Sequence, residues 1–292
     1  RVCNFQQRTR GSAPTFGGAA MVWPDASSGA GIAMLAGIGL VAGIVNILAG
    51  GGGLIALPAL VLLGGLGDTT ANGTFRIAVL AQTLTAVVRF ERGGHVEWRI
   101  GGRLLVPTLI GAALGAWQAA TLGDGGTRRL LVGSTLLATM LLLVGERWLA
   151  APPTAEFTDW TDSSKPSRRV LPLIGLPPAL ALGLLVAGWY GGLIQAGVGF
   201  VLLLVLRRAG GFALGRATVM KVLLVLGYTP IALLVFANGA KIDPYAGLSL
   251  AAGMAVGAWI GAGLSVGPAA SGRIRVAVAM MVAVAAVRLV LA

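Results

Sequence analysis

Residues 42–60 read AGIVNILAGGGGLIALPAL, an apolar segment interrupted by four consecutive glycines at 50–53. Glycine is a poor helix former, so this segment is expected to form two helical arms with a break between them. A second break is expected in residues 189–200, WYGGLIQAGVGF, where the letters AGVG correspond to AGGG at 49–52. Two glycine-interrupted apolar segments in corresponding places are the best sequence pointer to the binding site of a secondary transporter.

The composition around these breaks is that of a membrane protein. The chain of 292 residues is 56% hydrophobic and 11% charged, whereas soluble proteins carry about 25% charged residues. Apolar runs of about 20 residues, long enough to cross a bilayer as helices, recur along it. The sequence therefore predicts an all-α integral membrane protein that crosses the membrane several times. The apolar segments fall at about 30–49, 54–66, 74–90, 100–122, 129–149, 172–196, 198–206, 217–237, 244–268 and 273–292.

The two halves resemble each other, which predicts an internal duplication. Arg76 follows the first break and Lys221 follows the second at nearly the same spacing, and the triplet GAW occurs at 115–117 and again at 257–259. Each half is expected to hold one interrupted element and three transmembrane helices. The predicted divisions are an N-terminal extension at 1–29, expected to be disordered, repeat 1 at 30–149, a polar cytoplasmic linker at 150–170 and repeat 2 at 171–292. Residues 1–20, which precede Met21, are interpreted as an upstream extension.

Basic residues orient these repeats and account for the net charge of +12. Basic loops of membrane proteins face the cytoplasm, and no basic stretch here is interleaved with aromatic residues, so a nucleic-acid partner is not expected. Placing the main basic clusters in the cytoplasm puts loops 67–73, 122–128 and 238–243 outside and makes the two repeats inverted. Arg128 and Arg129 oppose this assignment. Whether the interrupted elements cross the membrane or re-enter is left open.

The two cations suggest the charge of the solute. Arg76 and Lys221 lie inside apolar segments, while all ten acidic residues lie in loops or at segment ends. With no intramembrane carboxylate to balance them, the cations are interpreted as ligands of a small anion. The alternative is that each side chain reaches back to the membrane interface.

Glycines and amides complete the candidate site. A broken helix exposes backbone N–H groups, and a following helix start adds partial positive charge, which together favour an anion. Buried amides either cap the broken helices or contact the substrate. Tyr228 and Trp189 are interpreted as packing residues. The predicted substrate-binding residues are Asn46, Gly50, Gly51, Gly52, Asn72, Thr74, Arg76, Gln82, Gln195, Gly197 and Lys221.

The sequence gives little support for catalysis or metal binding. Cys3 is the only cysteine and His95 the only histidine, and neither a zinc-binding H-E-x-x-H nor a phosphate-binding G-x-x-x-x-G-K-[ST] motif occurs. Catalytic residues, metal ligands and cofactors are therefore not expected, and the protein is not expected to be an enzyme.

The segments around the breaks and the cations also resemble the sulfite exporter TauE/SafE family of membrane permeases. The resemblance covers about residues 30–292 and rests on 42–60, on ANGTFRIAVLAQ at 71–82, on 189–200 and on ATVMKVLLVL at 217–226. Family members often have Ser or Thr where Gly53 stands, and Asn where Phe75 stands. The resemblance implies a multi-pass protein of the plasma membrane that transports sulfite, organosulfonates and related sulfur-containing anions, usually outward.

The expected function is therefore a secondary transporter of small sulfur-containing anions, working by alternating access. An anion channel of the same architecture and a non-transporting membrane assembly factor are the alternatives. The expected partners are the anionic substrate and the lipid bilayer, and a homodimer is compatible with the sequence.

Overall fold

The computed structural model describes residues 28–122, 125–130, 132–133, 176–239, 242–266, 269, 272–273 and 276–277. The elements of this part are all helices, as the sequence predicts. In chain order they are α1 (Gly29–Ala49), α2 (Gly53–Leu62), α3 (Asp68–Arg92), α4 (Trp98–Thr121), α6 (Pro178–Leu193), α7 (Val198–Arg208), α8 (Leu214–Asn238) and α9 (Pro244–Leu264).

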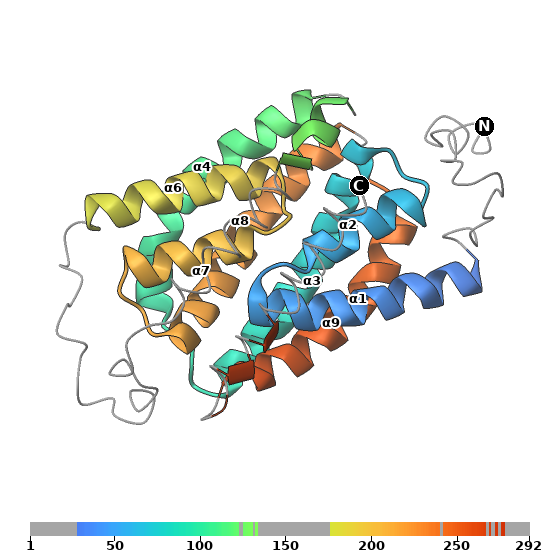
Figure 1. Cartoon of the computed structure of the whole chain (residues 1–292). Coiled ribbons are helices and arrows are strands. Elements are labelled where there is room, and N and C mark those ends of the chain that lie inside the picture. The colour runs from blue at the N-terminus through green and yellow to red at the C-terminus, as the bar shows by residue number, and fades with distance from the viewer. Residues whose placement is uncertain are drawn as a thin grey trace.

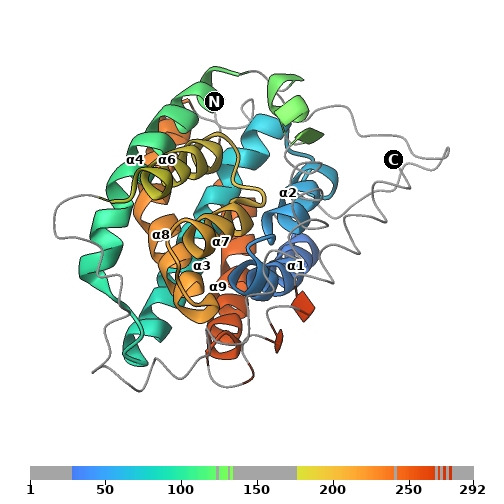
Figure 2. The same cartoon turned by 60° about the vertical axis from the view of Figure 1, so that its left-hand side comes forward.

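The helices form a bundle with α3 and α8 in the middle. On one side of this central pair α4 packs on α6, and on the other side α1 packs on α9 (Figures 1 and 2). The shorter helices α2 and α7 follow α1 and α6 after the two breaks. Each half therefore contributes one of the two central helices.

The two outer helix pairs use the same packing device. In each pair both helices present two glycines four residues apart, and a Cβ added at any of them would meet the partner's backbone. Small residues at this spacing let helix backbones approach closely in a membrane. The repeated GAW triplet supplies one glycine to each pair. The glycines are Gly39 and Gly43 against Gly253 and Gly257 in the α1–α9 pair, and Gly111 and Gly115 against Gly188 and Gly192 in the α4–α6 pair.

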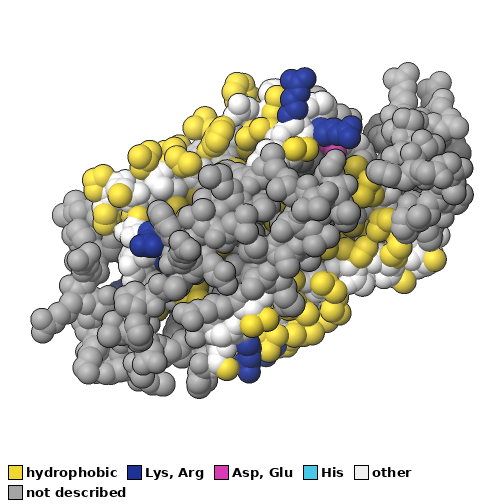
Figure 3. All heavy atoms as spheres, viewed as in Figure 1, with side chains coloured by type: hydrophobic (Ala, Val, Ile, Leu, Met, Phe, Trp, Pro, Cys, Tyr) yellow, Lys and Arg dark blue, Asp and Glu magenta, His cyan; other side chains and the backbone are white. Residues whose placement is uncertain are grey.

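The helices are suited to a lipid environment. In the described part, α1, α4, α8 and α9 are long and apolar enough to cross a membrane. On the face seen in Figure 3, hydrophobic side chains cover much of the described surface and Lys and Arg gather in a few groups. Large apolar side chains are exposed along these helices, among them Val41, Ile110, Leu114, Leu234 and Leu248. The chain is a multi-pass membrane protein.

Helix α3 begins earlier than its apolar segment. Residues 68–73, predicted to lie in an outer loop, form its first turns. The prediction was wrong because it relied on hydropathy, and the polar residues of these turns are buried by protein rather than by lipid. Thr69, for example, is 4% exposed and shares a hydrogen bond of 3.0 Å with Thr127.

Two further boundaries differ from the sequence estimate. Helix α2 ends at Leu62 rather than at 66, because Gly65 adopts a positive φ of +63° that ends the helix. Helix α6 begins at Pro178, where a proline is favoured at the first helical position. The extension, the linker and the spans at 129–149 and 273–292 lie wholly or mostly outside the described residues.

Hydrogen bonds and an ion pair near the helix termini show which helix ends lie together, and they divide these ends into two sets. At one end Arg216, at the start of α8, pairs with Glu97 before α4, and Arg89 of α3 donates to the Trp259 carbonyl of α9 over 2.6 Å. The other end is joined by the Thr69–Thr127 bond and by the Asp243 N–H, which donates to Thr74 Oγ1 over 2.8 Å. The N-termini of α3 and α8 therefore belong to different ends of the bundle.

Candidate functional site

Each of the two helix breaks contains one glycine in the left-handed conformation. Gly50 has a φ of +80° and ends α1, with its N–H donating to the Asn46 carbonyl over 2.9 Å. Gly197 has a φ of +75° and directly precedes α7. Residues other than glycine adopt this conformation at a cost of about 1–2 kcal/mol. The glycine pattern read from the sequence thus corresponds to two helix breaks with the same backbone requirement.

The two breaks lie against each other. A Cβ added at Gly199 would stand 2.5 Å from the Gly50 Cα and 2.9 Å from the Gly50 oxygen, and one added at Gly50 would meet Gly199 and Phe200. Gly53 likewise faces Ala196, whose Cα would lie 2.9 Å from an added Cβ. The interrupted elements of the two halves therefore cross with their backbones in contact.

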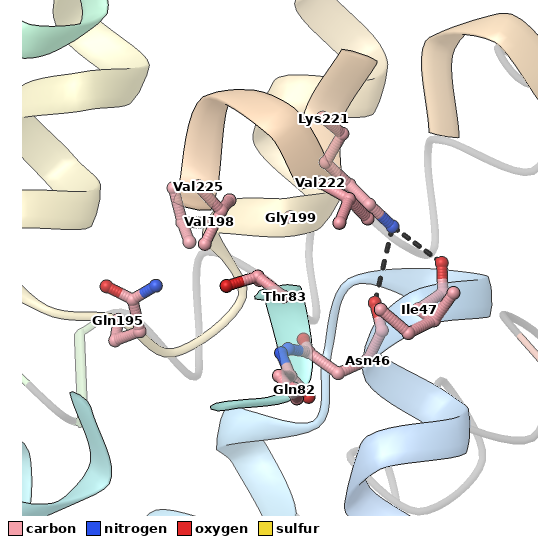
Figure 4. A pocket seen from close by; sticks show the side chains of 10 residues that line it. All are labelled: Asn46, Ile47, Gln82, Thr83, Gln195, Val198, Gly199, Lys221, Val222 and Val225. Carbon is pink, nitrogen blue, oxygen red and sulfur yellow. Dashed lines mark hydrogen bonds between the residues drawn. The ribbon is translucent and has the colours of Figure 1, made fainter. Parts of the chain in front are cut away.

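Lys221 lies beside this crossing and binds the end of the other half's broken helix. It is the eighth residue of α8, is 2% exposed, and its Nζ donates to the carbonyls of Ile47 (2.7 Å) and Asn46 (3.2 Å) in the last turn of α1 (Figure 4). The last carbonyls of a helix have no partners within the helix and carry partial negative charge. Lys221 therefore caps α1.

Arg76 caps the helix that ends at the second break, α6. It is the ninth residue of α3 and is fully buried, with its guanidinium donating to the carbonyls of Gly192 (2.5 Å) and Gly191 (3.3 Å) in α6 and to Gln195 Oε1 (3.2 Å). The Phe236 ring lies 4.7 Å from its Cζ. Each half thus caps the broken helix of the other half. Both side chains are buried and directed to helix ends inside the bundle, which does not favour the alternative in which they reach back to the membrane interface.

A small cavity lies at the crossing, between the two halves. Its volume, measured as the space open to the centre of a water molecule, is about 10 Å³, close to what one water molecule requires. None of the described residues that line it carries a carboxylate. Figure 4 shows Lys221 on one side, Gln82 near Asn46, and Gln195 across from them. The lining residues are Asn46, Ile47, Gln82, Thr83, Gln195, Val198, Gly199, Lys221, Val222 and Val225.

Gln82 stands out within this lining. Its side chain is fully buried, yet neither its amide nitrogen nor its amide oxygen has a hydrogen-bond partner among the described residues. A buried amide without partners costs about 1–3 kcal/mol. Such a side chain facing a cavity is typical of a group that binds a solute or a water molecule.

The other predicted amides hold the breaks together. Asn46 Oδ1 accepts from the Gly52 N–H over 3.2 Å, and Asn72 Nδ2 donates to the Leu193 carbonyl at the end of α6 over 3.1 Å. Gln195 accepts from Arg76 and donates to Tyr228 Oη over 3.0 Å. These amides cap or brace the broken helices, as one of the two sequence interpretations expected.

The structure brings together part of the predicted set. Asn46, Gln82, Gln195 and Lys221 line the cavity. Gly50, Gly52 and Gly197 belong to the crossing, as does the buried Gly51. Arg76 and Asn72 lie at the end of α6 instead, and Thr74 binds the Asp243 N–H at one end of the bundle.

Sequence reasoning omitted six lining residues, four of which are the aliphatic Ile47, Val198, Val222 and Val225. Thr83 directly follows Gln82, and Gly199 belongs to the repeated glycine motif, so sequence neighbourhood was the signal for both. The reading of Tyr228 as a packing residue agrees with its full burial, whereas Trp189 is 38% exposed and donates to Gln118. In the described part of the chain, no cluster of His, Cys, Asp and Glu suited to a metal ion is found.

The fold and the site describe a multi-pass membrane protein with two broken helices crossing at a cationic, amide-lined cavity. The family model Sulfite exporter TauE/SafE matches residues 35–289. Because this match covers most of the chain, the protein belongs to that family.

Two curated relatives are similar over most of their lengths, and a third over less than half. A probable membrane transporter protein of Haemophilus influenzae is 26% identical over 230 residues, which are 79% of this chain and 83% of that protein. The probable membrane transporter protein YfcA of Escherichia coli K12 is 26% identical over 227 residues, 78% of each chain. One from Xylella fastidiosa is 34% identical over 122 residues, 40% of this chain and 44% of its own. No solved structure matches the chain. The protein is thus similar to membrane transporters.

Proposed function

We propose that the protein is a secondary transporter that moves small sulfur-containing anions, such as sulfite or organosulfonates, across the plasma membrane by alternating access. The observation that carries this proposal is the cavity where the two halves meet. Its charged lining residue is Lys221, its polar lining residues are neutral, and Gln82 offers two unsatisfied amide atoms. A buried site with a cation, uncharged donors and no carboxylate favours an anion.

The family supports the choice of substrate. Its model is described as a sulfite exporter, and sulfite and sulfonates are compact oxyanions that accept several hydrogen bonds at once. Lys221 supplies a point charge, the amide of Gln82 supplies a directed donor, and the crossing glycines leave backbone groups close to the same place.

The small volume of the cavity supports a carrier rather than an open pore. Space for about one water molecule does not admit a sulfur oxyanion, so we infer that the two halves move apart to bind it. The grouping of helix ends, with the α3 and α8 N-termini at different ends, supports two inverted repeats related by an axis in the membrane plane. In such transporters one half rocks against the other around a central site.

Flux in proteoliposomes tests the proposal. Purified protein is expected to give saturable uptake of ³⁵S-sulfite or sulfoacetate, with counterflow when the same anion is trapped inside. Acetate and taurine, which has no net charge at neutral pH, serve as comparison solutes. Unitary currents in a planar bilayer without saturation or counterflow would indicate a channel. Flux equal to that of protein-free liposomes for every anion would overturn the proposal.

A further inference from the structure

The two capping cations differ in what surrounds them. Lys221 lines the cavity, and its two hydrogen bonds engage two of the three protons of its ammonium group. Arg76 does not belong to the cavity lining, and its two terminal nitrogens donate to Gly191, Gly192 and Gln195. Its buried Nε has no hydrogen-bond partner among the described residues, so the difference from Lys221 lies in the cavity and not in the number of engaged donors. The Phe236 ring covers the guanidinium. Two equivalent roles in helix capping therefore come with unequal access to a solute.

The unequal access of the two cations is explained by the residue that lies seven positions after each of them. The residue seven places, or two helical turns, after Arg76 is Thr83, and it lines the cavity beside Lys221. The residue seven places after Lys221 is Tyr228, and it lies in the corresponding region beside Arg76. Its hydroxyl accepts from Gln195, the residue that binds Arg76, and would be 2.6 Å from a Cβ added at Gly191.

Side-chain size decides which region is open. Thr83 Oγ1 donates to the Val79 carbonyl of its own helix over 2.7 Å, so its main contribution to the cavity is the room that a small side chain leaves. Tyr228 is fully buried and places a phenol ring where the first half has a methyl and a hydroxyl group. The second region is filled.

We propose that the chain has a single anion site, in which Lys221 contacts the solute, and that Tyr228 is the specificity-determining residue that closes the matching region beside Arg76. Arg76 is then a positioning residue that holds the end of α6 and the side chain of Gln195. This inference rests on the proposed function and assigns different roles to the two cations of that same site.

The different roles of Lys221 and Arg76 are tested by measuring anion binding and transport on the same variants. The affinity of purified protein for sulfite and sulfoacetate is measured by calorimetry, and KM and Vmax per folded protein are measured in proteoliposomes. Lys221→Gln is expected to weaken affinity and to raise KM at least tenfold. Arg76→Gln is expected to change both by less than threefold and to lower Vmax and the melting temperature. Arg76→Lys, which keeps the charge and one donor nitrogen, is expected to restore part of Vmax.

Tyr228 is tested in the Lys221→Gln background, where the original site is impaired. Adding Tyr228→Thr is expected to expose Arg76 and to recover affinity at least threefold. Tyr228→Phe, the matched control, keeps the ring and is expected to recover none.

The outcomes distinguish this inference from the proposed function. If the unmutated protein binds and transports sulfite but Arg76→Gln loses affinity as strongly as Lys221→Gln, the division of roles is wrong. It is also wrong if the Thr and Phe variants at position 228 behave alike. If Arg76→Gln does not fold, Arg76→Lys decides, because a tenfold loss of affinity in a folded protein contradicts a positioning role. If the unmutated protein binds none of these anions, the proposed function itself fails.

Discussion

The two breaks cross at one place but are built differently. Around the first, side chains are absent: Gly50, Gly52 and Gly53 each bring backbone so close to a neighbour that an added Cβ would collide. Around the second, side chains fill the space. Gln195 joins Arg76 to Tyr228, and Ile194 is 1% exposed. The crossing therefore combines a bare backbone from one half with a hydrogen-bonded set of side chains from the other.

This difference shows that the number of glycines does not measure how firmly a break is specified. Four consecutive glycines mark the first break and two separated glycines mark the second. Each break nevertheless has one left-handed residue, Gly50 or Gly197. Of the additional glycines of the first break, Gly53 packs closely against Ala196 of the second, and Gly52 packs against Ala42 and Asn46 of α1.

The largest expected effect comes from exchanging glycine for asparagine at the two left-handed positions. Asparagine tolerates positive φ better than other residues with side chains, so Gly197→Asn, at a buried position, is expected to lower the melting temperature less than Gly50→Asn. Gly50→Asn would in addition drive its side chain into the Gly199 backbone. It is expected to abolish both the folded protein and the flux. Size-exclusion profiles and melting temperatures in detergent measure the difference.

Gly37→Ala is the control for this pair. Gly37 lies in α1 with nothing within 4 Å of an added Cβ, and alanine is the better helix former. Stability and flux are expected to stay at or above the unmutated values. Equal damage from Gly50→Asn and Gly197→Asn would contradict the expectation that the collision with the Gly199 backbone makes Gly50→Asn the more damaging change.

An intermediate effect is expected where side chains fill the second break. Gln195→Met keeps the volume but removes the acceptor of Arg76 and the donor to Tyr228. Loss of an acceptor for a buried charged group costs about 1–3 kcal/mol or more. The expected result is a melting temperature several degrees lower, read by a thermal-shift assay. An unchanged value would mean that Gln195 does not brace the second break.

The sequence predicted the parts of the site better than their mutual arrangement. The breaks, the cations and most polar lining residues were recognisable, because a glycine cluster or a charge in an apolar segment is unusual by itself. Thr74 was included because it precedes Arg76 by two residues, but such residues do not share a helix face. Asn72, four residues before Arg76, does share it, and both bind the end of α6. The cross-capping depends on how α3 and α8 pack, which no local pattern records.

The smallest expected effect on stability among the site residues is at Gln82 beside the first break, and its sign is opposite to that expected at Gln195. Gln82→Met removes two amide atoms that have no hydrogen-bond partner among the described residues and keeps a similar volume. Replacing unsatisfied buried polar atoms with apolar ones is neutral or stabilising, so the melting temperature is expected to stay equal or rise. Affinity for sulfite is expected to fall severalfold, because Lys221 keeps its charge but the solute loses a directed donor.

Gln118→Met is the control, because Gln118 is an exposed amide on α4 whose oxygen accepts from Trp189. The affinity of the Gln118→Met variant for sulfite is expected to equal that of the unmutated protein. A loss of stability in Gln82→Met without a change in affinity would make Gln82 a structural partner of the first break. Its unsatisfied amide would then no longer support a solute site there. The combination of higher stability and lower affinity is the usual consequence of a polar group retained for binding, and it would separate Gln82 from Gln195, whose loss is expected to lower stability.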